Sequence, residues 1–223
     1  MTRVQHRSKR RVRTRERGTA VVEFALGVVL FWIPLFLGSV VIGFNLIRAV
    51  QVTQVARDAG HMYASGIDFS QATYQNLLVD LAVGLNMTTT GGSGVVYLST
   101  VAFITASSCT SGGLQADSTH CPNLNTTVFT QQIVIGNSSL GFQSTLGSPN
   151  PADMDSSGNV SVTGQLTDTA NQIPNFQNLI PCFSSSSSTS CTQIAYVSEM
   201  FETSPVTGWW FSSTPSISAR SIF

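Results

Sequence analysis

An unbroken apolar segment constrains this chain more than any other feature of its 223 residues. Residues 20–47, 28 in all, contain one charged side chain, Glu23. A helix of that length reaches about 42 Å, against about 30 Å for the hydrocarbon core of a bilayer. The apolar core of a secretory signal is shorter, about 7–15 residues. We therefore predict a transmembrane helix over residues 19–48, with a kink at Pro34.

Charge is divided unequally along the chain. Residues 1–18 form a basic leader with eight Lys or Arg and one acid, whereas the remaining residues hold three arginines against ten acids. Positive charge before a membrane span predicts a cytoplasmic amino terminus and export of the chain beyond the span. Basic runs can also bind nucleic acid, but this one adjoins the apolar segment without a spacer. We therefore expect the lipid bilayer as its partner, and no nucleic acid.

Glu23 stands where a membrane helix should not favour a carboxylate. A charged side chain costs about 2.5–3.5 kcal/mol at the centre of a bilayer and less near the end of a helix. Glu23 is the fourth residue of the apolar segment and lies close to the basic leader. A positive charge held at the same depth would compensate it.

The spacing from Gly18 to Glu23 resembles the processing site of type IV prepilins. This resemblance implies that a prepilin peptidase cuts after Gly18 and makes Thr19 the new amino terminus. The new ammonium group would lie on the same helix face as Glu23, four residues further on. The ammonium of one subunit could then pair with Glu23 of a neighbour, with Phe24 beside it in the subunit contact.

Further elements narrow the resemblance to the TadE-like minor pilins, or pseudopilins, of Tad (tight adherence) pili, and they cover about residues 15–66. They are Arg17-Gly18, Val22-Glu23-Phe24-Ala25, Pro34, Gly43-Phe44, Ala56-Arg57-Asp58-Ala59-Gly60 and Tyr63-Ala64. Two residues depart from the family pattern: Pro34 lies about four residues late, and His61 stands where arginine is frequent. Tyr196–Phe201 is similar to the strand that closes many TadE- and TadG-like proteins.

The resemblance implies a minor component that assembles or initiates a Tad-like pilus. Its expected partners are other pilin subunits, the pilus assembly machinery and the prepilin peptidase. Its expected location is the bacterial inner membrane, crossed once, with the carboxyl-terminal domain in the periplasm or in an extracellular pilus.

Helical periodicity continues past the apolar segment and predicts a helical stem over residues 49–90, exposed to the periplasm. The first apolar stripe comprises Val52, Val55, Ala56, Ala59 and Tyr63, and the second comprises Tyr74, Leu77, Leu78, Leu81 and Leu85. Apolar residues at three- and four-residue steps form one face of a helix. We expect both faces to pack on the carboxyl-terminal domain, and the first also to contact neighbouring subunits.

Residues 91–223 are rich in Ser, Thr, Gly and Asn with short apolar runs, which predicts a small β-rich domain with Ser/Thr-rich loops. The predicted strands are Val95–Thr105, Thr127–Ile135, Gln193–Phe201 and Val206–Ser212. The serine tract 184–188 is expected to form an exposed loop. The predicted fold class is therefore α+β: a long membrane helix, a helical stem and a β-rich domain.

Four cysteines agree with export to an oxidising compartment. Four cysteines allow three disulfide connectivities. Proximity alone favours two local pairs, Cys109 with Cys121 and Cys182 with Cys191.

An active site is not evident, so we predict no enzyme and no cofactor. His61 and His120 are isolated, without a histidine–carboxylate pattern that would orient a base. One loop has oxygen donors at alternate positions, as in the first half of a calcium loop: Asp153, Asp155, Ser157 and Asn159. Its twelfth position, Gly164, lacks the bidentate acid. The alternative for this loop is a turn closed by Asx hydrogen bonds.

A second function fits the same anchor. The chain would be an unprocessed, signal-anchored envelope protein whose exported domain binds a ligand or surface, as an adhesin does. The amino-terminal residue separates the two: Thr19 for the processed pilin, Met1 for the unprocessed anchor.

Overall fold

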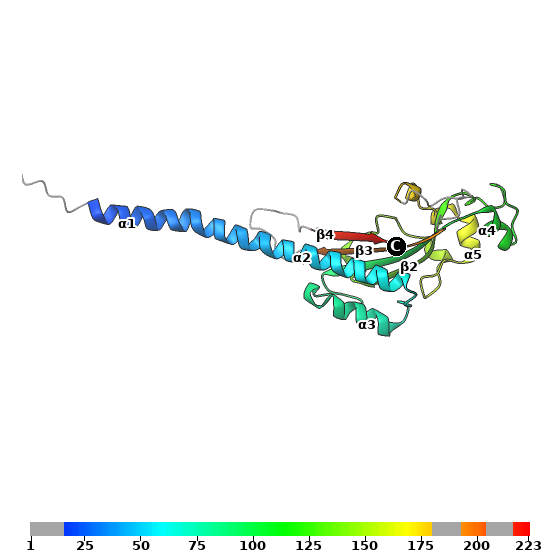
Figure 1. Cartoon of the computed structure of the whole chain (residues 1–223), viewed down its shortest axis with the longest axis horizontal. Coiled ribbons are helices and arrows are strands. Elements are labelled where there is room, and N and C mark those ends of the chain that lie inside the picture. Colours follow the sequence, from blue (N-terminus) through cyan, green and yellow to red (C-terminus); the bar gives the residue numbers. More distant parts are fainter. Residues whose placement is uncertain (1–15, 180–192, 204–215) are drawn as a thin grey trace, which may run out of the picture. The chain divides into compact units, whose positions relative to one another are not determined.

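The computed structural model describes residues 16–179, 193–203 and 216–223 (Figure 1). Side chains are described within these ranges from residue 19 onward. The chain divides into two compact units, residues 1–44 and residues 45–223. The second is called the folded unit. The fold is α+β, as the sequence predicts, with a long apolar helix near the amino terminus and a four-stranded antiparallel sheet.

The amino-terminal helix changes its winding before Pro34. It comprises α1 (Glu16–Gly27), the π-helical turn η1 (Val28–Trp32) and α2 (Ile33–Ala64). Proline has no N–H, and its ring crowds the carbonyl four residues earlier in an α-helix. The wider turn relieves this crowding, and the Ile33 N–H donates to the Val28 carbonyl five residues back. A π-helical turn therefore lies where the sequence predicts a kink.

Apolar side chains in residues 19–44 are exposed around the helix. Phe24, Leu30 and Phe36 are 74%, 75% and 65% exposed. The helix Thr19–Ala64 is long and apolar enough to cross a membrane, judged by length and composition, and none of its most apolar stretch is buried inside the chain. An apolar surface of this extent is typical of a segment that contacts lipid or another protein.

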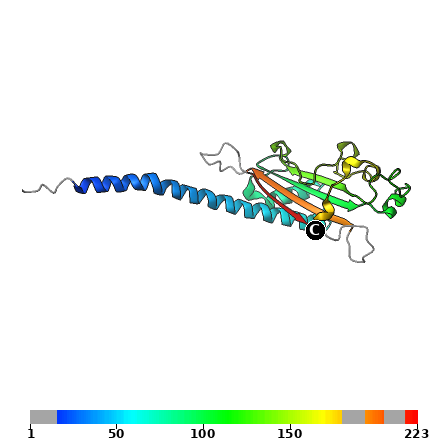
Figure 2. The same ribbon diagram turned by 90° about the horizontal axis from the view of Figure 1, so that it is seen from above.

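The sheet has the order β2-β1-β3-β4, and each neighbouring pair is antiparallel. Its strands are β1 (Gly94–Phe103), β2 (Thr127–Gly136), β3 (Ile194–Thr203) and β4 (Ser216–Ile222). A bulge at Thr100/Val101 shifts the register between β1 and β2. Figure 2 shows the strands lying side by side.

Three predicted strands are confirmed as β1, β2 and β3, with small differences at their ends. The prediction Val206–Ser212 lies outside the described residues. Residues 196–201 belong to β3, an inner strand that is followed by β4. β4 was not predicted, because its sequence, SISARSI, has too few apolar residues to stand out. As an edge strand it hydrogen-bonds to one neighbour only.

The carboxyl-terminal part of α2 packs on one face of this sheet. The first predicted stripe, Val52, Val55, Ala56, Ala59 and Tyr63, is buried in the chain's own core. Small residues bring the helix close to β3: the Ser198 hydroxyl donates to the Ala56 carbonyl. A Cβ added at Gly60 would lie 2.6 Å from the Ser198 hydroxyl and 2.4 Å from the Phe223 ring. Packing between the helix and the sheet inside one chain therefore explains the small residues Ala56, Ala59 and Gly60.

Helix α3 (Ala72–Leu81) and the turn η2 (Val83–Leu85) come after α2 in the chain, and α3 lies beside α2 in Figure 1. Leu78 and Leu85 of the second stripe are buried, as predicted. Leu77 and Leu81 are instead 43% and 45% exposed. The prediction that this whole face packs inward is therefore only half right, because a single short helix beside α2 presents just one side to the core.

Loops and short helices cover the opposite face of the sheet. They include α4 (Ala106–Ser111), α5 (Val162–Thr167) and the short 3-10 turns η3 (Ser138–Leu140), η4 (Pro151–Asp153), η5 (Thr169–Asn171) and η6 (Phe176–Asn178). They enclose a second core around Phe129 and Phe176. Buried Asn123 and Asn171 donate hydrogen bonds to backbone carbonyls in and just after α5, which pairs polar groups that are buried away from water.

The disulfide between Cys109 and Cys121 is present, as predicted, with a Cα–Cα distance of 6.1 Å. It ties α4 to the loop before β2. The second predicted pair, Cys182 and Cys191, lies outside the described residues, as does the serine tract 184–188.

Candidate functional site

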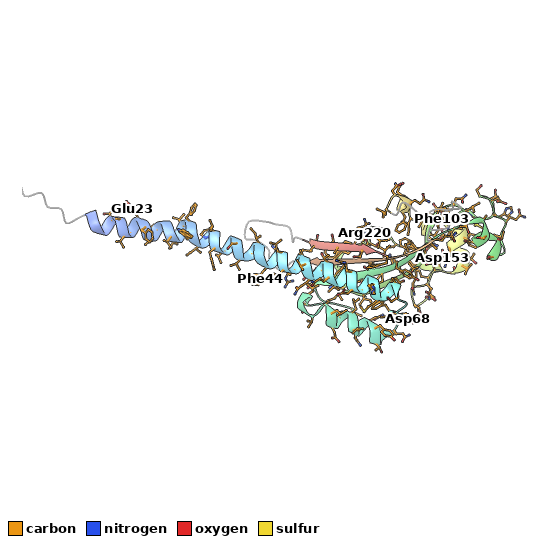
Figure 3. The ribbon with its side chains drawn as sticks, in the orientation of Figure 1. Glu23, Phe44, Asp68, Phe103, Asp153 and Arg220 are labelled. Atoms are coloured by element: carbon orange, nitrogen blue, oxygen red, sulfur yellow. A yellow bond between two sulfur atoms is a disulfide. The ribbon has the colours of Figure 1, made fainter. Side chains whose placement is uncertain are left out.

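The predicted processing and assembly residues lie together near the start of α1. Gly18, Thr19, Glu23 and Phe24 all fall within Glu16–Gly27. Thr19 and Glu23 are four residues apart and therefore share a face of the helix. Glu23 and Phe24 are exposed, and Figure 3 marks Glu23 on α1. Within this chain, the carboxylate and the aromatic ring are therefore accessible to a partner.

An ion pair joins α2 to β3 inside the folded unit. Arg48 Nη1 lies 2.5 Å from Glu202 Oε1, and their side chains are 24% and 0% exposed. Burial raises the pKa of the Glu202 carboxyl, and the Arg48 charge offsets only part of that rise. Glu202 Oε2 has no hydrogen-bond partner among the described residues. Arg48, the last residue of the predicted membrane span, is thus held on the sheet.

A second buried carboxylate fixes a loop on the opposite face of the sheet. Glu199 accepts hydrogen bonds from the hydroxyls of Ser144 and Thr145, and the Thr145 N–H lies 3.1 Å from its Oε2. Arg220 lies opposite Glu199 in the register of β3 and β4, and its side chain donates to the Thr145 hydroxyl at 2.9 Å. Figure 3 marks Arg220 on β4. These contacts hold the loop after η3 in place and are structural.

A cavity of about 390 Å³ opens where α2 ends over the sheet. We name it the Tyr196 cavity. The turn at Gly66–Asp68 lines one side, and side chains of β1, β2 and β3 line another, among them Thr100, Gln131 and Tyr196. Asp68, marked in Figure 3, lies just beyond the end of α2. Because these elements are far apart in sequence, the cavity exists only in the folded unit.

A series of hydrogen bonds connects side chains along the wall of the Tyr196 cavity. The Thr100 hydroxyl donates to the Tyr63 hydroxyl, which donates to Gln131 Oε1, each at 2.7 Å. Gln131 Nε2 donates to the Ser157 carbonyl at 3.3 Å. The Tyr63 and Tyr196 rings meet edge to face, with centroids 5.4 Å apart. These contacts fix the orientation of the polar groups before any ligand arrives.

The candidate calcium loop forms a hydrogen-bonded turn. Asp155 accepts from the N–H groups of Ser157 and Asn159, each at 2.8 Å, and from the Asn159 side chain. These bonds lower the pKa of the Asp155 carboxyl. Asp153 instead accepts from Asn171 at 2.8 Å. The hydrogen bonds that Asp155 accepts are those of the Asx turn, the alternative for this loop. Among the described residues, no group of three or more His, Cys, Asp or Glu is placed to bind a metal ion.

One histidine does have a carboxylate partner, contrary to the sequence analysis. His120 Nδ1 lies 2.9 Å from Asp117 Oδ2. Asp117 also accepts from the His120 and Thr119 N–H groups, and these bonds lower the pKa of its carboxyl. Both side chains are about half exposed. The pair closes a local turn of four residues, Asp117 to His120, which the sequence analysis did not identify.

Comparison with known proteins gives no relative: no protein-family model, curated protein or solved structure matches this chain.

The ion pair and the cavity were both missed in the sequence analysis. Arg48 and Glu202 are 154 residues apart, and nothing local couples them. A usable signal existed, since Arg48 is one of only three arginines after the leader and directly follows the apolar segment. No comparable signal marks the cavity, because Tyr63, Thr100 and Gln131 are ordinary residues for a helix and two strands.

Proposed function

We propose that this chain is a TadE-like minor pilin, anchored in the bacterial inner membrane by its amino-terminal helix and processed after Gly18. It takes part in assembling or initiating a Tad-like pilus. Under this proposal Thr19 becomes the amino terminus, and Glu23 and Phe24 contact a neighbouring subunit. The folded unit lies in the periplasm or on the pilus, and it has no catalytic role.

One observation carries the proposal: a long helix with exposed apolar residues holds an exposed carboxylate near its start. Lipid can cover the apolar side chains, but it cannot compensate Glu23. A neighbouring ammonium can, and cleavage after Gly18 would create one four residues before Glu23. The basic leader, which would be removed, accounts for the inserted orientation.

The first test is the amino-terminal residue of the protein purified from membranes of cells that hold a prepilin peptidase. We expect Thr19, and the matched variant Gly18→Leu should keep Met1 because it removes the glycine after which the cut is proposed. An intact Met1 on the unchanged protein would overturn processing. It would favour the alternative, an unprocessed anchor whose folded unit binds a ligand or surface.

The second test addresses Glu23. Glu23→Ala should leave insertion and cleavage intact but reduce co-purification with pilin partners at least about tenfold. A loss of about 1.4 kcal/mol in binding free energy raises the dissociation constant by that factor. The control is Asp58→Ala, which removes an exposed acid from α2 outside the predicted span. Equal co-purification of both variants with pilin partners would refute the ammonium–carboxylate pair.

A further inference from the structure

The Tyr196 cavity has the size and the wall of a small-ligand site. Its volume of about 390 Å³ falls at the lower end of the range for such sites, about 300–1,000 Å³. That space suits one six-membered ring rather than a nucleotide or a peptide. The wall combines aromatic rings with hydroxyl and amide groups, so a ligand must offer both an apolar face and several hydrogen-bonding groups.

The fixed amides and hydroxyls offer both donors and acceptors to a ligand. Gln131 has a second amide proton besides the one given to Ser157, because a side-chain amide carries two donors. Asn159 and Thr130 also line the cavity. The Thr130 hydroxyl donates to the Thr100 carbonyl at 3.1 Å and keeps its lone pairs as acceptors. This mixture matches the alternating hydroxyls of a sugar.

Tyr196 supplies the apolar surface. Its ring is half-buried, lies against Tyr63 edge to face, and is carried on the rigid inner strand β3. A ring held in this way loses little conformational entropy when a ligand packs on it. The C–H face of a hexose can lie on such a ring while its hydroxyls reach the amides.

Charge excludes the main competing ligands. Asp68 is the one charged residue among those described that line the cavity, so no lining arginine or lysine can recognise a phosphate or carboxylate. Asp68 is itself engaged: it accepts from the Ser70 hydroxyl at 2.6 Å and from Gln71 Nε2 at 2.9 Å. A single occupied carboxylate does not make a metal site.

We propose that the Tyr196 cavity binds one neutral saccharide unit, with its C–H face on Tyr196 and its hydroxyls on Gln131, Thr130 and Asn159. This inference is independent of the proposed pilin role. It gives the folded unit a binding activity whether or not the leader is removed.

The test uses the full chain in a zwitterionic detergent, because maltoside and glucoside detergents carry sugar headgroups. Glucose, galactose and N-acetylglucosamine are titrated against the protein by saturation-transfer NMR, with glucose 6-phosphate as the anionic comparison. We expect at least one neutral sugar to bind with a Kd of about 1–10 mM, as for a small ligand with few contacts. The phosphate should bind more weakly.

Three variants locate the binding. Tyr196→Ala should weaken it at least about tenfold, whereas Tyr196→Phe, which keeps the ring, should retain it within about threefold. Tyr74→Ala, which removes a half-buried tyrosine of α3 outside the cavity, is the matched control and should bind normally. If Tyr196→Ala fails to fold, Asn159→Ala serves instead, because Asn159 is exposed.

Three results would overturn the proposal. The first is no saturation transfer to any of the neutral sugars at about 50 mM, well above the expected Kd. The second is binding that Tyr196→Ala and Asn159→Ala leave unchanged. The third is binding that favours the sugar phosphate over its neutral parent.

Discussion

Two regions of one helix differ in what surrounds their apolar side chains. In residues 19–44 these side chains are exposed around the helix, and large residues such as Phe31 and Trp32 are frequent. In residues 45–64 the apolar stripe is buried against the sheet, and its residues include the small Ala56, Ala59 and Gly60. A helix that is apolar on all sides needs an external apolar environment, whereas an amphipathic one is stabilised by its own domain.

The two regions are therefore under different sequence constraints. The exposed region is constrained by its overall composition and tolerates exchange of one apolar residue for another. The buried region is constrained by close contacts at single positions, where the shape of each residue matters. Arg48 lies near the start of the buried region, and its ion pair with Glu202 ties the helix to β3.

The strongest test of this comparison is Arg48→Ala. It leaves the Glu202 carboxylate buried without its cation, and breaking a buried pair in this way costs about 3–5 kcal/mol. We expect that loss in the free energy of unfolding of the folded unit, measured on the full chain in detergent by denaturant titration followed by circular dichroism. In the exposed region, Leu30→Ala should change the same quantity by less than about 0.5 kcal/mol.

The control for Arg48→Ala is Glu202→Gln. This variant removes the buried charge and keeps the shape, so it should cost little or stabilise the folded unit. If both variants destabilise the folded unit equally, the attraction between the two charges exceeds the free-energy cost of burying the Glu202 carboxylate. Arg48 would then stabilise the folded unit through the pair itself rather than by neutralising a buried acid.

A second test uses two glycines of the same helix. Both Gly38→Ala and Gly60→Ala gain helix propensity, about 0.8–1.0 kcal/mol for an α-helix interior. A Cβ at Gly38 meets nothing within 4 Å, whereas one at Gly60 meets Ser198 at 2.6 Å. Ser198 is fully buried and hydrogen-bonded to Ala56, so it cannot easily move.

Gly60→Ala should therefore be less stable than Gly38→Ala by about 1–3 kcal/mol, the usual cost of overpacking. Thermal unfolding of the two variants side by side measures this difference. Equal midpoints would mean that Phe223 and Ser198 move aside and that the helix does not depend on close approach to β3.

These contrasts also explain how far the sequence could predict the structure. The apolar helix, the buried stripe from Val52 to Tyr63, three of the strands and the Cys109–Cys121 bond depend on patterns within short stretches of chain, and they were predicted. Periodicity identifies a face but not how much of it a neighbour covers, which is why Leu77 and Leu81 were wrongly expected to pack inward.

The candidate functional residues likewise divide into those that a local sequence pattern reveals and those that it does not. The Gly18–Glu23 segment stands out by spacing and charge within one short stretch, and its role in processing and assembly stays a prediction. The Glu202 pair and the Tyr196 cavity depend on β3, which joins the sheet more than 90 residues after β1 begins. Strand order decides which residues meet there, and patterns within short stretches of sequence do not reveal that order.

The smallest expected effect is the pH dependence of the Glu202 contribution. Burial raises the pKa of the Glu202 carboxyl, so the folded state holds this proton more tightly than the unfolded state does. Its contribution to stability is therefore fully present below the unfolded pKa of a glutamate and is lost as the pH rises through the raised folded pKa. Gln at this position does not titrate. The unchanged protein should thus lose stability relative to Glu202→Gln as the pH rises from about 4, near the unfolded pKa of a glutamate, through the raised folded pKa. Unfolding midpoints of the two proteins across that pH range measure the difference. The contribution of every other acid cancels because both proteins share it.

A stability difference that does not change with pH, or that changes in the opposite direction, would mean that Arg48 compensates the buried carboxylate fully. The ion pair with Arg48 would then add to the packing of Val52 to Tyr63 in holding the helix on β3.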